Sequence, residues 1–460
     1  MTFKKDRIHS LYRSVRFIVK AGLGIFFQRI EVRHPELLPH VGPAVLVANH
    51  PNSIMDAMVL WAAIDRKVNY IAHAGLFRAR FMNWLLRNIG VIPVYRRQDA
   101  PDMMEQNVST FRASYEVLEK GETIGIFPEG TSDMLRKVKQ VKTGAARIVL
   151  ETEARNGYDL GVKLIPVGLH FFSRSHFRSR VLVNVGAPIP LVKYFTRYNT
   201  NPIAGVAELT AEIQARLEQL TVNIQDEELD EFVHALEQIY RDELLAENPQ
   251  VSASKSSFPQ FFLSQKIAEG VQYYRRRRPE LFAAIRDQVA SYQRKLARLN
   301  LRDELLRETA NTRRAWCEYG QAGIVALLGF PFALYGVSNN FLPYHLAELA
   351  AKKFLDERTK ILTALLFAGG LAFIFFYTLQ IGIVARYFGS WWAGAYAISL
   401  PTSGLWAISY LKRMRAYGER LSFSVFLFTN RHLINRLRLE RKRLIKALNA
   451  VREEFQKVEL

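Results

Sequence analysis

Residues 43–60 read PAVLVANHPNSIMDAMVL, and this stretch decides the fold. Residues 44–48 are apolar, with valine at alternate positions, so they predict a buried strand. The apolar run after the polar turn predicts a helix over residues 54–64. A strand, a loop and a helix in that order form the repeating unit of an α/β sheet, in which functional side chains lie on loops at the strand ends.

The same alternation of short apolar runs and helical stretches continues to about residue 225. Further strands are expected at residues 68–72, 89–94, 123–127, 163–170 and 181–185. Further helices are expected between them, at residues 81–88, 103–120 and 143–153. The fold class expected for residues 31–225 is therefore an α/β domain with a central sheet flanked by helices.

The composition describes a folded and strongly basic chain. It has 460 residues, of which 49% are hydrophobic and 23% charged, and its formal net charge is +20. These proportions exclude a disordered or collagen-like protein. The single cysteine, Cys317, excludes an intramolecular disulfide framework and any CxxC zinc or redox motif. The positive charge predicts an anionic partner, which could be nucleic acid, a phospholipid surface or a phosphorylated substrate.

Two long uncharged stretches in the C-terminal third favour a membrane as that partner. Residues 361–385 and 391–410 are each long enough to cross a bilayer, and basic residues precede the first and follow the second. This pattern predicts a transmembrane helical hairpin with both flanks in the cytoplasm. Residues 320–344 are also uncharged, but their proline, glycine and asparagine residues make a re-entrant or interfacial segment the expected form. We therefore expect an integral membrane protein whose catalytic domain lies on the cytoplasmic face.

The remaining segments complete the expected organisation. Residues 1–30 interleave basic and aromatic residues, which suits either a helix at an anionic bilayer surface or a helix that caps the core of the next domain. Residues 226–319 are expected to form a helical arm that carries no chemistry. Residues 320–411 are expected to form the membrane region, and residues 412–460 a basic helical tail.

His50 and Asp56 are the candidate catalytic pair. On one helix their spacing would place them about 240° apart, but with His50 in the loop and Asp56 in the first helical turn the two side chains can meet. A carboxylate that fixes one imidazole nitrogen leaves the other free to accept a proton, as a general base must. The alternative is structural, because Ser53 and Asp56 also fit an S-x-x-D capping box.

Other loops carry candidate substrate-binding residues. Residues 123–132, TIGIFPEGTS, run from a strand into a tight turn, where Glu129 could hydrogen-bond an acceptor hydroxyl and the N–H of Gly130 or Thr131 could face an oxyanion. Residues 90–97, GVIPVYRR, deliver Arg96 to the end of a strand, and arginine suits a bidentate grip on phosphate. An ordinary turn and solvated surface charge are the alternatives for these loops.

Taken in order, these stretches resemble the four sequence blocks of the glycerolipid acyltransferase superfamily. The blocks are Asn-His-Pro-Asn-Ser-x-x-Asp, Gly-x-Ile-Pro-Val-x-Arg, Phe-Pro-Glu-Gly-Thr-Ser and Ile-Pro-Val, all within residues 31–191. The first block and the expected hairpin are most similar to the glycerol-3-phosphate/dihydroxyacetone-phosphate acyltransferase branch. Five residues separate His50 from Asp56, one more than in the common family motif, which implies a wider turn.

The resemblance implies transfer of a fatty acyl chain from acyl-CoA or acyl carrier protein to a hydroxyl of glycerol-3-phosphate, in the synthesis of phosphatidic acid. It makes His50 the base and Asp56 its orienting partner, with direct attack of the hydroxyl on the thioester. Substrate binding is assigned by the same resemblance to Arg96, Glu129, Gly130, Thr131 and Lys142. No metal, and no cofactor other than the thioester co-substrate, is expected.

Other functions fit the same residues. Dihydroxyacetone phosphate, 1-acylglycerol-3-phosphate or another lysophospholipid could be the acceptor, because such motifs define the reaction better than the acceptor. A hydrolase built on His50 and Asp56 is an alternative, and so is a noncatalytic lipid-binding membrane scaffold. Nucleic-acid binding would explain the charge, but the uncharged stretches and the lack of a recognition motif favour a membrane.

Overall fold

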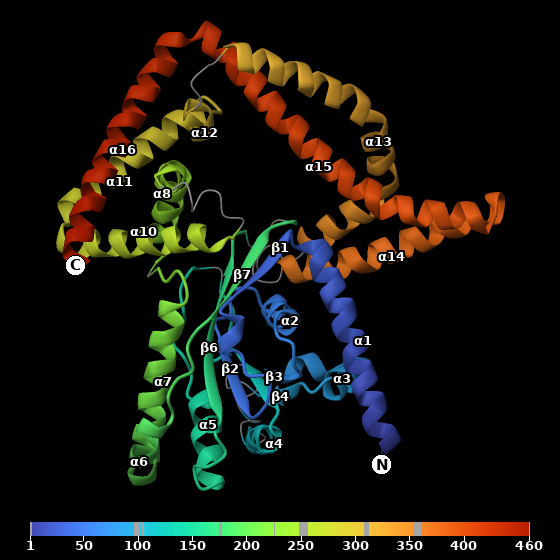
Figure 1. The fold of residues 1–460 in the computed structure, drawn as a ribbon, viewed down its shortest axis with the longest axis vertical. Helices are drawn as coiled ribbons and strands as arrows, with labels where there is room; N and C mark the ends of the chain where they lie inside the picture. Colours follow the sequence, from blue (N-terminus) through green and yellow to red (C-terminus); the bar gives the residue numbers. More distant parts are fainter. Residues whose placement is uncertain are drawn as a thin grey trace. The chain divides into compact units, whose positions relative to one another are not determined.

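The computed structural model describes residues 2–95, 102, 105, 107–133, 135–173, 177–224, 226–247, 256–307, 312–352 and 361–459. The chain divides into two compact units (Figure 1). Unit 1 comprises Met1–Asp230, Ser254–Gln265 and Phe354–Thr363, and unit 2 comprises Glu231–Ala253, Lys266–Lys353 and Ala364–Leu460. Unit 2 thus groups most of the helical arm, the membrane region and the basic tail, which the sequence presents as separate segments.

A seven-stranded sheet in the order β1-β7-β6-β2-β5-β3-β4 organises unit 1. The strands are β1 (Arg29–Arg33), β2 (Ala44–Ala48), β3 (Val68–His73), β4 (Ile92–Val94), β5 (Thr123–Ile126), β6 (Lys163–Phe171) and β7 (Arg180–Val185). Strands β6, β2, β5, β3 and β4 are parallel, whereas β7 runs antiparallel to β6 and β1 lies parallel to β7. The expected α/β fold is confirmed, and β1 is an edge strand that the sequence interpretation missed.

Helices cover both faces of this sheet. They are α1 (Thr2–Phe26), α2 (Ile54–Ala63), α3 (Arg80–Asn88), α4 (Asn107–Glu119), α5 (Gly144–Arg155), α6 (Val192–Thr200) and α7 (Pro202–Gln219), with short 3-10 turns η1 (Pro35–Leu37) and η2 (Ala74–Phe77). Every residue of the central strand β2 is buried, as expected of a strand covered on both faces. Val45 and Val47 pack into a core shared with α4, α5 and α7, and α2 contacts α1 and β1 (Figure 1).

Helix α1 packs one side against unit 1, and its contact with a bilayer stays a prediction. Tyr12, Leu23 and Phe26 are buried in unit 1, where the Tyr12 hydroxyl accepts hydrogen bonds from the Trp61 indole N–H and from the Val68 N–H. The other side of the helix exposes Phe17 and Ile18. The helix therefore caps the core and still presents an apolar stripe.

Unit 2 is built from long helices. Its elements are α8 (Glu227–Ala246), α10 (Phe258–Arg277), α11 (Pro279–Arg298), α12 (Asp303–Arg307), α13 (Thr312–Lys352), α14 (Ile361–Phe388), α15 (Ser390–Thr429) and α16 (Arg431–Glu459), of which α8, α10 and α14 begin in unit 1. Among the described residues, two helical stretches are long and apolar enough to cross a membrane, Gly323–Ala350 and Thr363–Phe388.

The membrane region differs from the expected hairpin in two respects. The segment expected to be re-entrant or interfacial, 320–344, is part of the continuous helix α13, which carries Pro331 and Pro343 inside it and is bent (Figure 1). The second half of the expected hairpin, 391–410, is helical within α15 but is not among the two apolar stretches, because its Trp, Ser, Thr and Pro residues lower its mean hydropathy.

A polar seam joins α13, α14 and α15. The Asn339 amide oxygen accepts a hydrogen bond from the Tyr396 hydroxyl at 2.5 Å, and the Asn340 amide oxygen accepts one from the Tyr377 hydroxyl at 2.6 Å. Gln380 donates to the Asn339 carbonyl at 3.1 Å. These contacts satisfy the side chains that made this segment look unsuited to a bilayer, since polar groups there need partners inside the protein.

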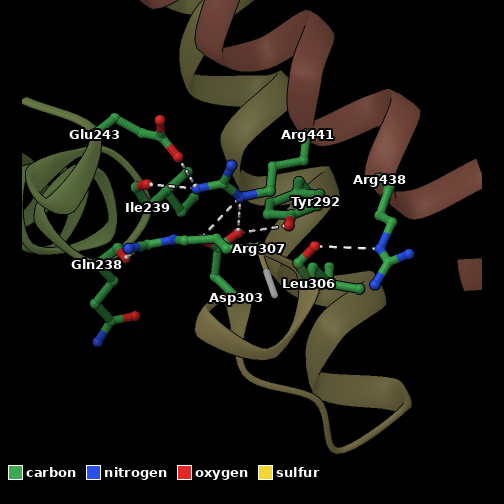
Figure 2. Close-up of polar contacts among 9 residues, drawn as sticks. All are labelled: Gln238, Ile239, Glu243, Tyr292, Asp303, Leu306, Arg307, Arg438 and Arg441. Carbon is green, nitrogen blue, oxygen red and sulfur yellow. Dashed lines mark hydrogen bonds and ion pairs between the residues drawn. The ribbon is translucent and has the colours of Figure 1, made fainter. Parts of the chain in front are cut away.

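A buried ionic cluster ties α16 to the helical arm (Figure 2). Arg441 Nε donates to both carboxylate oxygens of Asp303 at 3.0 and 3.1 Å, and its Nη2 donates to Glu243 at 2.8 Å. The Tyr292 hydroxyl donates to Asp303 at 2.6 Å, and Arg307 donates to it from the next turn. Two carboxylates are thus matched by two guanidinium groups inside one cluster.

We expect Arg441→Ala to lower the free energy of unfolding of unit 2 by about 3 kcal/mol, because it leaves buried carboxylates without their main partner. Thermal unfolding of the detergent-solubilised protein, followed by circular dichroism, measures the change. Arg443→Ala is the matched control, since Arg443 is exposed on the same helix and should have an effect of about 0.5 kcal/mol or less. Equal effects of the two substitutions would contradict the structural role of the cluster.

Candidate functional site

The structure brings His50 and Asp56 together at the end of β2. His50 lies in the loop after the strand, Asp56 in the first turn of α2, and His50 Nδ1 is 2.9 Å from Asp56 Oδ2. The Asp56 side chain is fully buried and the His50 side chain is 13% exposed. An ionised carboxylate can only accept hydrogen bonds, so Nδ1 carries the proton and Nε2 is left as the basic nitrogen.

The capping-box alternative does not describe this turn. Ser53, at the N-cap of α2, makes no side-chain capping bond and has φ 54°, in the left-handed region. The Asp56 carboxylate instead accepts the Asn52 N–H at 2.7 Å through the same Oδ2 that meets His50. The wider turn over residues 51–53 is therefore shaped around the carboxylate rather than around a serine cap.

Glu129 joins two loops to the catalytic turn. Its Oε1 accepts the backbone N–H of His50 at 2.9 Å, and its Oε2 accepts the backbone N–H of Lys139 at 3.0 Å. Glu129 is buried, and burial raises the pKa of its carboxyl while the two N–H bonds act in the opposite direction. Both oxygens hold backbone N–H groups, so the structure gives Glu129 a positioning role, and its contact with an acceptor hydroxyl stays a prediction.

An aromatic ring supports the imidazole from one side. The Phe127 ring stacks on His50 with the ring centres 4.4 Å apart and the planes 18° apart. Tyr70 lies on the other side of Phe127, with the ring centres 6.3 Å apart. The stack and the Asp56 bond together fix both the position and the plane of the imidazole.

The turn after β5 packs closely against a lysine. Gly130 has φ 74°, a conformation that is strained for other residues, and a Cβ added to it would lie 2.7 Å from Lys142 Nζ, so that flexible side chain would have to shift. The Gly130 N–H donates to the Phe127 carbonyl at 3.1 Å, so it is engaged within the turn in this structure, and an oxyanion contact by Gly130 or Thr131 stays a prediction. The Thr131 hydroxyl accepts from Lys139 Nζ at 3.3 Å, and Lys139 also pairs with Asp133 at 3.1 Å.

A pocket opens beside His50. Its lining comprises Asn49, His50, Pro51, Glu129, Asp133, Leu135, Arg136, Lys137, Val138, Leu169, His170, Thr221 and Val222. His50 therefore borders a hollow whose wall carries two basic residues, Arg136 and Lys137, and two acidic ones, Glu129 and Asp133. Arg96, the expected phosphate ligand, lies outside the described residues. Across the described ranges, no group of three or more His, Cys, Asp or Glu residues could hold a metal ion.

Several contributors to the site were not identified from the sequence. Asn49 extends the β2–β6 ladder with its side chain, which donates to the Leu169 carbonyl at 3.1 Å and accepts the Leu169 N–H at 2.6 Å. Phe127 and Asn52 were quoted within the motifs but given no role. The available signal was that each lies within two residues of His50 or Glu129 in the same two blocks.

Residues 29–170 match the family model Acyltransferase. With the four ordered blocks and the His50–Asp56 contact, this match decides the family of the domain. Residues 29–170 form an acyltransferase domain of the glycerolipid acyltransferase superfamily.

The relatives of this acyltransferase domain include enzymes that use different acceptors. Glycerol-3-phosphate O-acyltransferase 2 of Saccharomyces cerevisiae is 32% identical over 29% of this chain and 18% of its own length. A chloroplastic 1-acyl-sn-glycerol-3-phosphate acyltransferase of Arabidopsis thaliana is 29% identical over 33% of this chain and 40% of its own. The chain spans 18% to 56% of the length of the yeast acyltransferases that it matches.

A solved structure also matches the chain. The crystal structure of a 1-acyl-sn-glycerophosphate acyltransferase from Thermotoga maritima is 22% identical, with a TM-score of 0.35, and the match covers 48% of this chain and 84% of that one.

We expect Glu129→Gln to lower kcat about 100-fold, because the glutamine NH2 faces one of the two backbone N–H groups and releases a loop of the site. The change in kcat is measured from the steady-state rate of acyl transfer by the purified protein. Glu116→Gln on the exposed side of α4 is the matched control and should leave kcat unchanged. An unaltered kcat for Glu129→Gln would show that catalysis does not depend on the hydrogen bonds from Glu129 to the two backbone N–H groups.

Proposed function

We propose that the protein is a membrane-bound O-acyltransferase that moves a fatty acyl chain from an acyl thioester to a hydroxyl of glycerol-3-phosphate, in the synthesis of phosphatidic acid. The observation that carries the proposal is the buried His50–Asp56 pair beside a pocket that is also lined by Arg136 and Lys137. A base next to cationic side chains suits the activation of a hydroxyl on a phosphorylated acceptor.

In the proposed reaction, His50 Nε2 takes the proton of the acceptor hydroxyl as its oxygen attacks the thioester carbonyl carbon. A C–O bond forms and the C–S bond breaks, and the leaving thiolate takes up a proton. Asp56 holds Nδ1–H and stabilises the imidazolium that forms during the step. The reaction needs no covalent acyl-enzyme, since the hydroxyl attacks directly.

Positioning supports this role for His50. Proton transfer by a positioned base contributes about 10²- to 10⁴-fold to a rate. Three contacts hold the imidazole and its loop, namely the Asp56 carboxylate, the Phe127 ring and the bond from the His50 N–H to Glu129. A base fixed in this way needs little reorganisation in the transition state.

The acceptor has two candidates. Glycerol-3-phosphate is favoured by the Asn-His-Pro-Asn form of the first block, and a 1-acylglycerol-3-phosphate by the similar identity of the plant relative, whose name gives that acceptor. Both carry a phosphate, so Arg136 and Lys137 of the pocket lining do not distinguish between them. Arg96 remains our proposed phosphate ligand, and acyl-CoA or acyl carrier protein our proposed acyl donor, with no further cofactor.

A membrane location fits the chemistry and the helices of unit 2. The product carries an acyl chain and partitions into a bilayer, and α13 and α14 contain stretches long enough to anchor the protein there. The basic residues that follow residue 410 are proposed to keep that end of α15 in the cytoplasm, on the side of the acyltransferase domain.

We expect His50→Ala to lower acyl transfer at least 100-fold and Asp56→Asn to lower it strongly, because the first removes the base and the second its anionic partner. Membranes containing each variant are given labelled acyl-CoA or acyl carrier protein with either glycerol-3-phosphate or its 1-acyl form. The preferred acceptor is read from the product of the wild type.

His40→Ala is the control, because His40 is exposed on a loop of unit 1 and should leave transfer unchanged. Wild-type activity in the His50→Ala variant would remove the base from the mechanism. Absence of transfer by the wild type from both donors to both acceptors would favour the lipid-binding scaffold.

A further inference from the structure

The segment after β3 exposes an unusual set of apolar side chains. It comprises η2 and α3, within residues 74–88. Phe81 is 66% exposed and Trp84 52% exposed, and Leu76 and Met82 are exposed beside them. The Phe81 and Trp84 rings lie 6.1 Å apart, so they form one continuous aromatic surface. Leu85 and Leu86 of the same helix are half-buried and attach it to unit 1.

The same segment is purely cationic. Arg78, Arg80 and Arg87 are exposed in it, and the sequence has no acidic residue between His73 and Gly90. Within the described part of the chain, neither Arg78 nor Arg80 forms an ion pair, while Arg87 lies over the Phe77 ring. A short amphipathic helix with aromatic residues on its apolar side and arginines beside them matches the surface of an anionic bilayer.

The topology places this segment at the catalytic edge of the sheet. Strands β2, β5 and β3 are parallel, so their carboxyl ends meet at one edge. His50 follows β2, Phe127 follows β5, and η2 with α3 follows β3. The aromatic and basic segment therefore leaves the sheet on the same edge as the proposed base.

We propose that the η2–α3 segment docks on the anionic phospholipid surface, inserting Phe81 and Trp84 among the headgroups with Arg78 and Arg80 on lipid phosphates. This contact is separate from the anchoring by α13 and α14, and it turns the carboxyl edge of the sheet towards the lipid. Helix α1 lies beside α3 and carries its own exposed stripe of Phe17, Ile18 and Ile25 (Figure 1).

The test uses the full-length protein in nanodiscs, with an environment-sensitive fluorophore on a single cysteine. In a Cys317→Ser background, Phe81→Cys places the probe on α3. The discs contain phosphatidylcholine alone or with one third phosphatidylglycerol, and a fraction of the lipid carries a nitroxide quencher. We expect a blue shift and quenching at position 81, stronger in the anionic discs and weakened by high salt.

Two variants make the result specific. Ile203→Cys on α7 is a matched label, because Ile203 is also apolar and is 84% exposed, and its probe should stay in water in both discs. Adding Arg78→Gln and Arg80→Gln to the Phe81→Cys protein should reduce the anionic preference by about fivefold for each arginine. Met82→Cys repeats the measurement should Phe81→Cys fold poorly.

Two results would overturn the proposal. A probe at position 81 that stays unquenched in both kinds of disc would show that the segment remains in water. A probe that is already shielded in detergent, without a response to lipid composition, would assign the surface to protein, either unit 2 or a second copy of the chain. Neither result depends on acyl transfer.

Discussion

The carboxylate of Asp56 is the group on which the site depends. A fully buried carboxylate is costly unless hydrogen bonds replace its water, and two of these bonds come from the imidazole and from the Asn52 N–H. Both donors belong to the loop between β2 and α2, so satisfying the carboxylate also fixes that loop. The turn that brings these two donors to the carboxylate requires a positive φ at Ser53, and this strained backbone conformation costs free energy.

The centre of the sheet was predictable because a short run of apolar residues between turn signals is typical of a buried strand. Strand β2 is buried on both faces and apolar throughout, and its predicted bounds agree with the structure. Strand β1, Arg29–Arg33, escaped because it alternates charged and apolar residues at the sheet edge. The helix over 320–344 was not foreseen because the partners of Asn339 and Asn340, which are Tyr396 and Tyr377 on other helices, cannot be identified from the sequence.

The same limit applies to the site. Sequence motifs identify residue types, and the three residues that they named, His50, Asp56 and Glu129, lie in contact with one another. They do not show which atom meets which, so Glu129 was expected to bind substrate although both its oxygens hold backbone N–H groups. Gly130 was expected to supply an N–H to an oxyanion, and in this structure that N–H is engaged by the Phe127 carbonyl in a turn with positive φ.

A parallel sheet explains why these parts converge. Parallel strands end at the same edge, so the loops that follow them lie close together. His50 follows β2, Phe127 and Glu129 follow β5, and the amphipathic helix α3 follows β3. An acyltransferase of this kind must join a water-soluble phosphate ester to a chain that prefers lipid. With the proposed function and the proposed docking of the η2–α3 segment on lipid, polar and apolar loops on one edge of one sheet would let both substrates approach from the membrane side.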